Sequence, residues 1–453
     1  RSITGPAPIA GMVRSGGPGV WQARPVHLFA DLAWRGLVHQ VTDPTLAAEL
    51  DGGQLTAYAG FDPSADSLGF GNLLPVVTLM RLQRAGHRPV ALAGGGTGLV
   101  GDPGGKTEER ALAPVEVIEA NVAAVRAQLG RFLDFGAGAG AAQAVLVDNR
   151  DWLGHLGLLD FLRDVGKHVT VNTMIARESV RARLEERERG ISYAEFSYML
   201  LQAYDFLHLY DTLGCRLQIG GGDQWGNIVA GADLIHRLRP AAKVFGLTSP
   251  LVLKADGTKL GKTEAGNVWL DAGRTSPYRL YQFLVRADDA MVGAYLRAYT
   301  FLSRPEIDEL DRLTAEHAER RQAQRALAWE VATLVHGEAE AARARDASEV
   351  LFSEDVRSLD EATLLDVFSE APATRRPVTD LDGAGVPLID VLVATDVATS
   401  RSDARRAVAQ GGVYVNNRRV PDAEARLAAG DTLHGRYLLL RRGKKDHHLV
   451  RFE

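Results

Sequence analysis

Short apolar runs alternate with amphipathic stretches along the first part of the chain, from about residue 28 to residue 270. Residues 90–93 and 216–219 have strand-like patterns, and both runs lead into glycine-rich turns. Between them, after Pro114, apolar residues recur every three or four positions over residues 115–132, which predicts a helix. Repetition of strand, glycine-rich turn and helix favours a parallel sheet covered by helices. In such sheets ligands bind beyond the carboxyl ends of the strands.

The rest of the sequence has two further textures. Residues 276–371 are dense in Ala, Glu, Arg and Leu with few helix breakers, which predicts a charged helical bundle. Residues 375–385 contain Pro377 and an Asp-Leu-Asp-Gly run, a composition typical of a linker. Residues 386–453 open with two short helical patterns and continue as short strands with a basic end. We therefore expect three structured regions.

Composition narrows the class of protein. The 453 residues are 46% hydrophobic and 24% charged, and the net charge of -5 confines any nucleic-acid-binding surface to local basic patches. A single cysteine, Cys215, excludes an internal disulfide and favours a reducing compartment, the cytoplasm. No apolar run has the length of a membrane span. Residues 1–27 are rich in Gly, Pro and Ser, so we expect a disordered extension; an organelle transit peptide is the weaker alternative.

Two glycine-rich motifs are poor guides to function. Residues 96–101 fit the G-x-G-x-x-G pattern, but Asp102-Pro103 follows at once and is a poor helix start. Gly105-Lys106-Thr107 resembles the end of a phosphate loop, but the first glycine of that pattern would fall at Val100, so the spacing does not fit. We interpret these glycines as positions where the backbone turns tightly over a ligand or a neighbouring strand.

Two segments are suited to a nucleotide. Lys259 and Lys262 flank a Leu-Gly pair, and two mobile cations can close over a polyphosphate and neutralise a leaving pyrophosphate. Glycines 220–222 end a strand, so a ligand can approach the backbone there, and Asp223 can accept hydrogen bonds from ribose hydroxyls. The ordinary alternatives are a solvated loop for the lysines and a helix cap for Asp223.

Two other segments are suited to a small polar ligand. Residues 192–195 fit a capping box, and in the helix that follows Tyr198, Gln202 and Asp205 share one face. This polar stripe is either the solvated side of the helix or the lining of a pocket. Residues 58–64 end a short strand and lead through glycines to a helix start, which is a ready phosphate site or an ordinary connection.

Together these segments resemble the bacterial-type tyrosyl-tRNA synthetases of the class I aminoacyl-tRNA synthetase family. The likeness covers the chain from about Leu32 to the C-terminus. Its most specific motifs, in the order of the family, are residues 58–63 (Tyr-Ala-Gly-Phe-Asp-Pro), 101–103 (Gly-Asp-Pro), 196–205, 218–227 and 259–263.

The resemblance implies a role for each matching residue. The tyrosine-binding set is Tyr58, Asp102, Tyr198, Gln202, Asp205 and Gln224. The ATP-binding set is Gly60, Asp62, Gly69, Gly71, Gly221, Asp223, Lys259 and Lys262. The catalytic set is Lys259, Lys262, Thr263, Ser64, Asn72, Lys106 and Arg110, and the RNA-binding set is Arg401, Arg405 and Arg406. Tyr58 and Asp205 would hold the phenolic hydroxyl of tyrosine.

The implied activity is that of an ATP-dependent, AMP-forming tyrosine-tRNA ligase. Its first step needs alignment and charge stabilisation rather than a protein nucleophile, which fits the lack of a Ser-His-Asp or Cys-His constellation. Mg²⁺ would arrive with ATP as substrate, and no protein-bound metal or organic cofactor is expected. The implied partners are tyrosine, ATP, tRNA(Tyr) and a second copy of the chain, with no membrane.

The resemblance also implies the domain order. A Rossmann-like parallel-sheet catalytic domain is expected at 28–272 and an α-helical anticodon-arm domain at 273–374. A linker at 375–385 would lead to a small α+β RNA-binding domain of the ribosomal small-subunit protein type at 386–453.

The sequence departs from the family at its histidine motif. Where the family has a His-Ile-Gly-His type of sequence, residues 69–72 are Gly-Phe-Gly-Asn. Gly69 cannot donate a hydrogen bond to phosphate, so we hypothesise a slowed first step. The alternatives are an engineered variant, or a catalytically weak paralogue that acts as an RNA-binding protein. A tryptophanyl-type enzyme is disfavoured by Tyr58 together with Asp205.

Overall fold

The computed structural model describes residues 27–101, 113–175, 180, 191–263, 266–350, 354–369, 371–443 and 446–453. The chain divides into two compact units. The first comprises Arg1–Asp271 and Ala290–Arg312, and the second comprises Ala272–Asp289 and Leu313–Glu453. Residues 290–312 therefore belong to the sheet-containing unit, although their sequence is helical like that of their neighbours.

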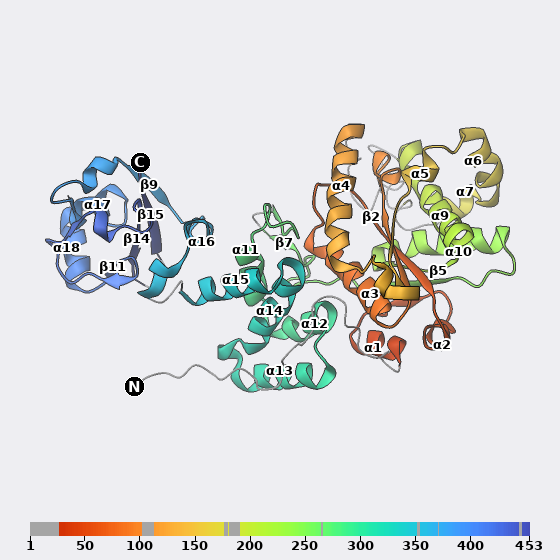
Figure 1. Ribbon diagram of the computed structural model, residues 1–453, viewed down its shortest axis with the longest axis horizontal. Helices are drawn as coiled ribbons and strands as arrows, with labels where there is room; N and C mark the ends of the chain where they lie inside the picture. Colours follow the sequence, from red (N-terminus) through yellow and green to blue (C-terminus); the bar gives the residue numbers. More distant parts are fainter. Residues whose placement is uncertain are drawn as a thin grey trace. The chain divides into compact units, whose positions relative to one another are not determined.

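A six-stranded sheet forms the centre of the first unit, in the order β1-β6-β5-β2-β3-β4 (Figure 1). Its strands are β1 Gln40–Val41, β2 Thr56–Phe61, β3 Arg88–Ala93, β4 Val145–Asp148, β5 Cys215–Gly221 and β6 Phe245–Ser249. All neighbouring pairs are parallel except β1 with β6. The predicted parallel sheet is confirmed.

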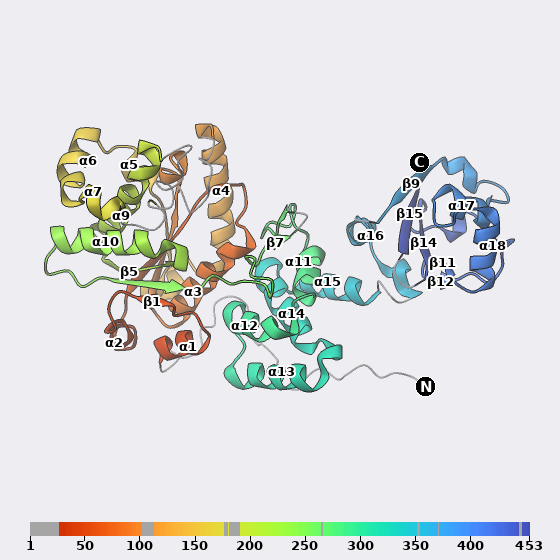
Figure 2. The ribbon, with the colours of Figure 1, turned by 180° about the vertical axis from the view of Figure 1, so that it is seen from behind.

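Helices cover this sheet and carry its connections, as Figure 2 shows from behind. These helices are α1 Leu28–Trp34, α2 Leu46–Gly52, α3 Leu73–Arg84, α4 Val115–Phe132, α5 Arg150–Leu153, α6 Leu158–Asp164, α7 Val171–Ile175, α9 Tyr193–Leu213 and α10 Trp225–Leu238. Two further helices, α12 Asp289–Tyr299 and α13 Arg304–His317, come after the last strand of the sheet. Short 3-10 turns include Phe70–Asn72, Thr97–Leu99 and Gly222–Gln224. The helix predicted from periodicity is confirmed. Five of the six apolar positions that predicted it are buried, and Val115 at its first residue is exposed. The buried positions are Ile118, Val122, Val125, Leu129 and Phe132.

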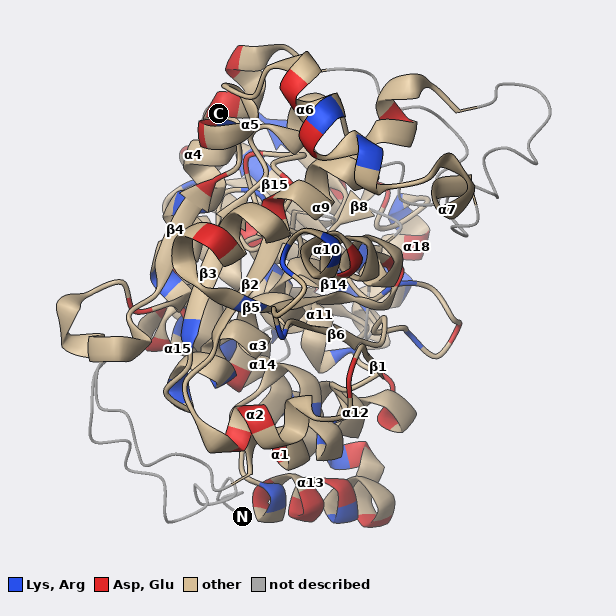
Figure 3. Ribbon diagram, turned by 90° about the vertical axis from the view of Figure 1, so that its right-hand side faces the viewer, with Lys and Arg blue, Asp and Glu red and all other residues tan. Residues whose placement is uncertain are grey.

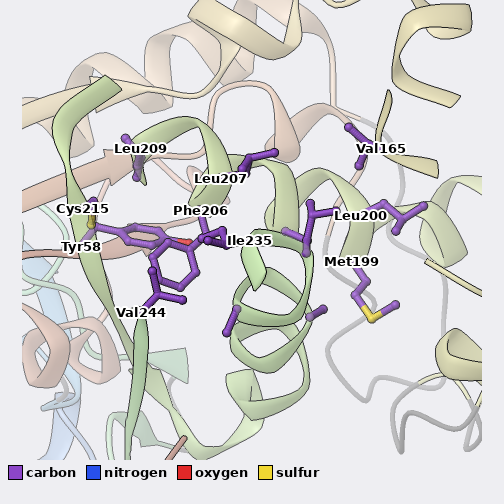
Figure 4. Packing of buried hydrophobic residues seen from close by; sticks show 14 of the residues in the cluster. Tyr58, Val165, Met199, Leu200, Phe206, Leu207, Leu209, Cys215, Ile235 and Val244 are labelled. Atoms are coloured by element: carbon purple, nitrogen blue, oxygen red, sulfur yellow. The ribbon is translucent and has the colours of Figure 1, made fainter. Parts of the chain in front are cut away.

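Helix α9 shows how local sequence sets an element. Ser192 Oγ accepts from the backbone N–H of Glu195 at 3.3 Å, and the Ser192 N–H donates to Glu195 Oε2 at 3.5 Å, which confirms the predicted capping box. Gly214 ends the helix at φ 61°, a left-handed conformation that glycine adopts without strain. The apolar face of α9 packs on β2: the rings of Tyr58 and Phe206 lie 5.4 Å apart (Figure 4).

The strand order creates a switch point. From β2 the chain runs outward to β3 and β4, then returns to β5 on the other side of β2 and continues to β6. Connections therefore leave β2 and β5 in opposite directions at their carboxyl ends. In open α/β sheets such a point leaves a crevice that binds ligands.

The second unit combines helices with a smaller sheet. Its helices are α11 Pro277–Val285, α14 Gln322–His336, α15 Glu338–Val350, α16 Glu361–Val367, α17 Leu388–Ala394 and α18 Arg401–Ala409. A five-stranded sheet has the order β12-β11-β14-β15-β9, with β9 Ala373–Arg376, β11 Val413–Val415, β12 Arg418–Arg419, β14 Tyr437–Arg442 and β15 Asp446–Phe452. Two pairs of short strands complete the chain: β10 Val386–Pro387 with β13 Arg426–Leu427, and, in the first unit, β7 Lys262–Thr263 with β8 Gly266–Asn267.

Both faces of the five-stranded sheet are buried. Leu438 and Leu440 belong to the core that includes α17 and α18, whereas Leu439 between them belongs to the core that includes α16. This alternation follows from the two-residue period of a strand. The stretch 375–385 contributes two residues to β9 and Leu381 to the first of these cores. An α+β region at the C-terminal end is confirmed.

Candidate active site

A cavity of about 340 Å³ lies at the switch point of the first unit, at the carboxyl ends of β2 and β5. It brings together twelve of the residues singled out in the sequence: Tyr58, Gly60, Asp62, Gly71, Asn72, Tyr198, Gln202, Asp205, Gly221, Asp223, Gln224 and Lys259. Four others do not line it: Ser64, Gly69, Lys262 and Thr263. Three more, Asp102, Lys106 and Arg110, lie outside the described residues.

Asp205 of α9 forms a buried polar end of the cavity. Its Oδ1 accepts from Trp152 Nε1 at 2.8 Å and its Oδ2 accepts from Asn149 Nδ2 at 2.9 Å. Only 2% of Asp205 is exposed, and burial raises the pKa of its carboxyl to about 7, although both donors favour the ionised form. Asp205 is therefore a fixed carboxylate whose charge changes near neutral pH.

The pKa of Tyr58 in β2 is affected by its burial and by the charge of Asp205. Burial, with the Asp205 carboxylate as the second cause, raises the pKa of the Tyr58 hydroxyl well above its usual range. That hydroxyl is buried and has no hydrogen-bond partner among the described residues. A buried hydroxyl without a partner costs about 1–3 kcal/mol, so a ligand hydroxyl that pairs with it gains stabilisation on binding.

A second polar group lies farther along α9. Gln202 Nε2 donates to Gln224 Oε1 at 3.2 Å, and Gln224 Oε1 also accepts from Asn227 Nδ2 at 3.1 Å. Gln202 Oε1 is buried and has no partner within the described part of the chain. The Tyr198 hydroxyl donates to Asp62 Oδ1 at 3.4 Å. The open amide oxygen of Gln202 lies one turn of α9 after Tyr198, and an oxygen of this kind suits a ligand ammonium group.

Helix periodicity correctly placed three of these residues. Tyr198, Gln202 and Asp205 all line the cavity, so the polar stripe of α9 faces a pocket and not solvent. Of the two interpretations of this stripe, the lining of a pocket is confirmed and the solvated helix side is wrong.

Sequence reasoning missed four residues of the site. Asn149 and Trp152 follow β4 and hold both oxygens of Asp205. Thr97 Oγ1 accepts from Asn149 Nδ2 at 2.9 Å and lines the cavity. Gln218 of β5 also lines it, with a buried Oε1 that has no partner among the described residues. A polar amide between two buried apolar residues of β5, Leu217 and Ile219, was a signal that could have found Gln218.

The other end of the cavity is built from glycine turns. Gly71 and Asn72 lie in the 3-10 turn that opens α3, while Gly221 ends β5 and Asp223 lies in the 3-10 turn that follows it. Asn72 Oδ1 accepts from the backbone N–H of Gly69 at 3.1 Å, so its Nδ2 is the atom that can donate to a ligand. A Cβ added at Gly71 would meet no atom within 4 Å, so open space for a ligand lies beside this turn.

Lys259 is carried to the cavity by a tight hairpin. The Leu260 N–H donates to Val252 O at 2.9 Å, and the Lys254 N–H donates to Thr258 O at 2.8 Å. Lys259 Nζ lies 3.5 Å from Asp223 Oδ2, and both side chains are about half exposed. An exposed pair of this kind is worth about 0–1 kcal/mol, so the lysine is available to an anionic ligand. Lys262 and Thr263 lie beyond the hairpin in β7 and are exposed.

The arginines of α18 in the second unit are exposed but paired. Arg401 lies 2.5 Å from Asp390, Arg405 lies 3.5 Å from Glu424, and Arg406 lies 2.9 Å from Asp403. Arg442 also binds Asp403 through both oxygens and, with the Thr399 N–H and Arg406, holds the pKa of that carboxyl well below its usual range. Their guanidiniums are oriented, and phosphate would have to compete with carboxylates for them.

Comparison with known proteins first defines the class. Residues 50–353 match the family described as tRNA synthetases class I (W and Y), and residues 368–450 match the C-terminal domain described for tyrosine–tRNA ligases. A sheet with a ligand cavity at its switch point fits this class. Among the described residues, no helix is long and apolar enough to cross a membrane.

The relatives define the family more narrowly. A tyrosine–tRNA ligase from Roseiflexus castenholzii is 54% identical over 421 residues, 93% of this chain and 98% of the relative. One from Bacillus caldotenax is 51% identical over 94% of this chain and 99% of the relative. A crystal structure of a C-terminally truncated mitochondrial tyrosyl-tRNA synthetase from Aspergillus nidulans superposes with a TM-score of 0.65 at 33% identity, covering 72% of this chain and 94% of that one. The chain belongs to the tyrosine–tRNA ligase family, as the motifs predicted.

Proposed function

We propose that this chain activates tyrosine with ATP and transfers the tyrosyl group to the 3′ adenosine of tRNA(Tyr). The observation that carries the proposal is the Tyr58 hydroxyl, buried without a partner near the Asp205 carboxylate. A phenolic hydroxyl would accept from Tyr58 and donate to Asp205. Phenylalanine would leave both protein groups unpaired, and tryptophan has no hydroxyl to place there.

The rest of the cavity supports the first chemical step. The open amide oxygen of Gln202 would hold the ammonium group, and Gln224 would lie toward the carboxylate. The carboxylate oxygen attacks the α-phosphorus in line, which forms tyrosyl-adenylate and expels pyrophosphate. Lys259, with Lys262, would neutralise charge on the departing pyrophosphate, and Asn72 Nδ2 would donate to phosphate oxygen. Magnesium enters as part of the MgATP substrate.

In the second step a ribose hydroxyl of the terminal adenosine attacks the tyrosyl carbonyl and AMP leaves. Both steps depend on holding the reactants in line, so positioning and charge stabilisation supply most of the acceleration. We propose that the α18 arginines give the tRNA affinity and salt dependence, since guanidiniums contact phosphates without reading sequence.

The experiment that tests this function is amino-acid-dependent exchange of pyrophosphate into ATP. Exchange with tyrosine, and none with phenylalanine or tryptophan, is the expected result. If the protein binds tyrosine yet catalyses no exchange, the activity proposal is wrong and the RNA-binding alternative becomes the better one. A tyrosyl-adenylate analogue should also raise the melting temperature.

Replacement of Gly71 by alanine should raise the KM for ATP about tenfold. Gly71 lines the cavity, and a Cβ added there meets no atom within 4 Å, so the methyl group would enter open space where the nucleotide is proposed to lie. Its backbone conformation suits alanine, so folding should be normal. Tyrosine affinity should stay the same in equilibrium titration; Gly52→Ala, with equally open surroundings outside the cavity, is the matched control.

We also propose that two copies associate through an apolar surface on α6, α7 and the start of α9. This surface holds six of the eleven large hydrophobic side chains that are exposed among the described residues: Leu158, Leu159, Leu162, Val171, Ile175 and Tyr193. Leu159 is 80% exposed and Tyr193 is 72% exposed, whereas Phe161 between the leucines faces the core. Helix α7 carries no charged residue (Figure 3). Large exposed apolar patches mark association surfaces.

A double replacement, Leu159→Asp with Leu162→Asp, should therefore convert a dimer to a monomer at micromolar concentration. Light scattering during size-exclusion chromatography measures the mass directly. Val378→Asp is the control, because Val378 is also exposed but lies in the second unit. A variant that remains dimeric would place the interface elsewhere.

A further inference from the structure

Helix α12 contacts both segments that are proposed to handle ATP. The Tyr295 hydroxyl donates to Leu253 O at 2.8 Å, and Leu253 pairs with Lys259 across the hairpin. One turn later on the same face, the Tyr299 ring lies 4.9 Å from the ring of Phe70, which immediately precedes Gly71. Tyr295 and Tyr299 are 2% and 1% exposed. The helix therefore spans from the lysine hairpin to the turn at Gly69–Asn72.

The C-terminal end of α12 is held by two buried arginines. Arg35 donates to Arg297 O at 3.2 Å and to Leu302 O at 2.9 Å, and Arg81 donates to Thr300 O. Arg35 and Arg81 are 7% and 5% exposed, so these bonds form away from solvent. Donors at a helix C-terminus satisfy carbonyls that would otherwise lack partners.

One of these arginines connects the helix to the nucleotide turn. Arg81 lies in α3, which begins directly after Asn72. Arg35 is in turn oriented by Asp31, whose Oδ2 lies 2.9 Å from Arg35 Nε. The turn at Gly69–Asn72 and the end of α12 are therefore fixed to one another through α3. The hydrogen bond from Tyr295 to Leu253 O joins this same helix, α12, to the exposed hairpin that carries Lys259.

We propose that α12 sets the position of the Lys259 hairpin relative to the Gly69–Asn72 turn, with Tyr295 as a positioning residue for Lys259 during adenylate formation. The proposal rests on the proposed function. Tyr295 touches neither substrate; it acts through the backbone carbonyl of Leu253. Loss of its hydroxyl leaves the packed ring in place and frees the base of the hairpin. The ammonium of Lys259 then samples more positions and stabilises the departing pyrophosphate less well.

Tyr295→Phe should lower the rate constant of adenylate formation about three- to ten-fold, the range of one intramolecular hydrogen bond. The Kd for tyrosine should not change. The same substitution made in a Lys259→Ala background should cause no further loss, because Tyr295 then has no lysine to position. Equal losses in both backgrounds would show a general structural effect and overturn the proposal, as would no loss in the parent. Tyr437→Phe, which removes a hydroxyl bonded to Glu361 in the second unit, is the matched control.

A second measurement does not depend on catalysis. Lys259 and Lys262 are exposed trypsin sites on the hairpin and its continuation. Tyr295→Phe should speed tryptic cleavage there about three- to ten-fold at unchanged melting temperature. Unchanged cleavage would overturn the proposal even in a protein without exchange activity. A parent protein that fails in pyrophosphate exchange but shows faster cleavage in the variant would instead contradict the proposed function alone.

Discussion

Replacing Asp205 with asparagine should reduce kcat/KM for tyrosine activation by about 10²- to 10³-fold. The two carboxylate oxygens accept from Asn149 and Trp152, and the proposed substrate hydroxyl would donate to the same group. An asparagine amide offers one oxygen and one NH₂, so one of the two protein donors would face another donor. Two effects therefore lower kcat/KM. The substrate loses a charge-assisted hydrogen bond, and the asparagine side chain is misoriented by the donor that it cannot pair with.

The measurement is steady-state exchange across tyrosine concentrations, together with direct tyrosine titration. Asp211→Asn is the control, because Asp211 lies near the end of the same helix and pairs with Arg239 at the surface. A loss confined to KM would mean that Asp205 binds the ground state and transition state equally. Undiminished tyrosine activation in Asp205→Asn would remove the basis of the proposed specificity.

The same carboxyl predicts a pH dependence. Its pKa of about 7 in the free protein means that below neutral pH the group is protonated, and a neutral carboxyl accepts a hydrogen bond from a phenol more weakly than a carboxylate does. Tyrosine binding should therefore weaken by up to about tenfold per pH unit below pH 7, and the dependence should vanish in Asp205→Asn. A pH-independent Kd for tyrosine in the parent would contradict this account.

The raised pKa also bears on folding. In the unfolded chain the carboxyl titrates near pH 3.9, so the folded protein retains a proton over the window from about pH 4 to pH 7. The contribution of Asp205 to stability is fully present below that window and is lost as the pH rises through it. A ligand hydroxyl that donates to the ionised carboxylate offsets this loss, which couples stability to occupancy of the site.

Features that depend only on neighbouring residues in the sequence could be predicted from it. The polar stripe of α9 follows from a 3.6-residue period, and the glycines at residues 220–222 follow from a turn at a strand end. The partners of Asp205 could not be found this way. Asn149 and Trp152 follow a four-residue strand with no motif, and their contact with α9 joins positions more than fifty residues apart. Such contacts depend on the strand order, which the pattern does not contain.

The grouping of residues 290–312 has a similar cause. Their composition matches the helical region around them, yet buried hydrogen bonds from Arg35 and Arg81 tie them to the first unit across more than two hundred residues of sequence. Arginine is usually at the surface, so the hydropathy of the sequence does not predict that Arg35 and Arg81 are buried against backbone carbonyls. Helix α12 contacts both segments that are proposed to bind ATP, through Tyr295 and Tyr299.

Replacing Gly69 with histidine should raise the rate of adenylate formation by up to about 10²- to 10³-fold, the range associated with one preorganised donor to developing charge. Gly69 has φ -78° and ψ 162°, a conformation open to any residue, and an added Cβ would meet no atom closer than 3.7 Å. The present motif keeps one donor, Asn72 Nδ2, because Asn72 Oδ1 is occupied by the Gly69 N–H. The backbone N–H survives the substitution, so the imidazole would add a donor without removing this one.

Pre-steady-state formation of enzyme-bound tyrosyl-adenylate is the measurement, since steady-state aminoacylation can be limited by a later step. Gly69→Ala is the control, because it adds the Cβ without a donor and should leave the rate unchanged. An equal gain in both variants would assign the effect to a stiffer backbone. An unchanged rate in Gly69→His, in a protein that still binds tyrosine and ATP, would mean that the Gly-Phe-Gly-Asn turn already supplies full stabilisation. The slowed first step would then be wrong, and Asn72 with Lys259 would carry the phosphate chemistry of this cavity.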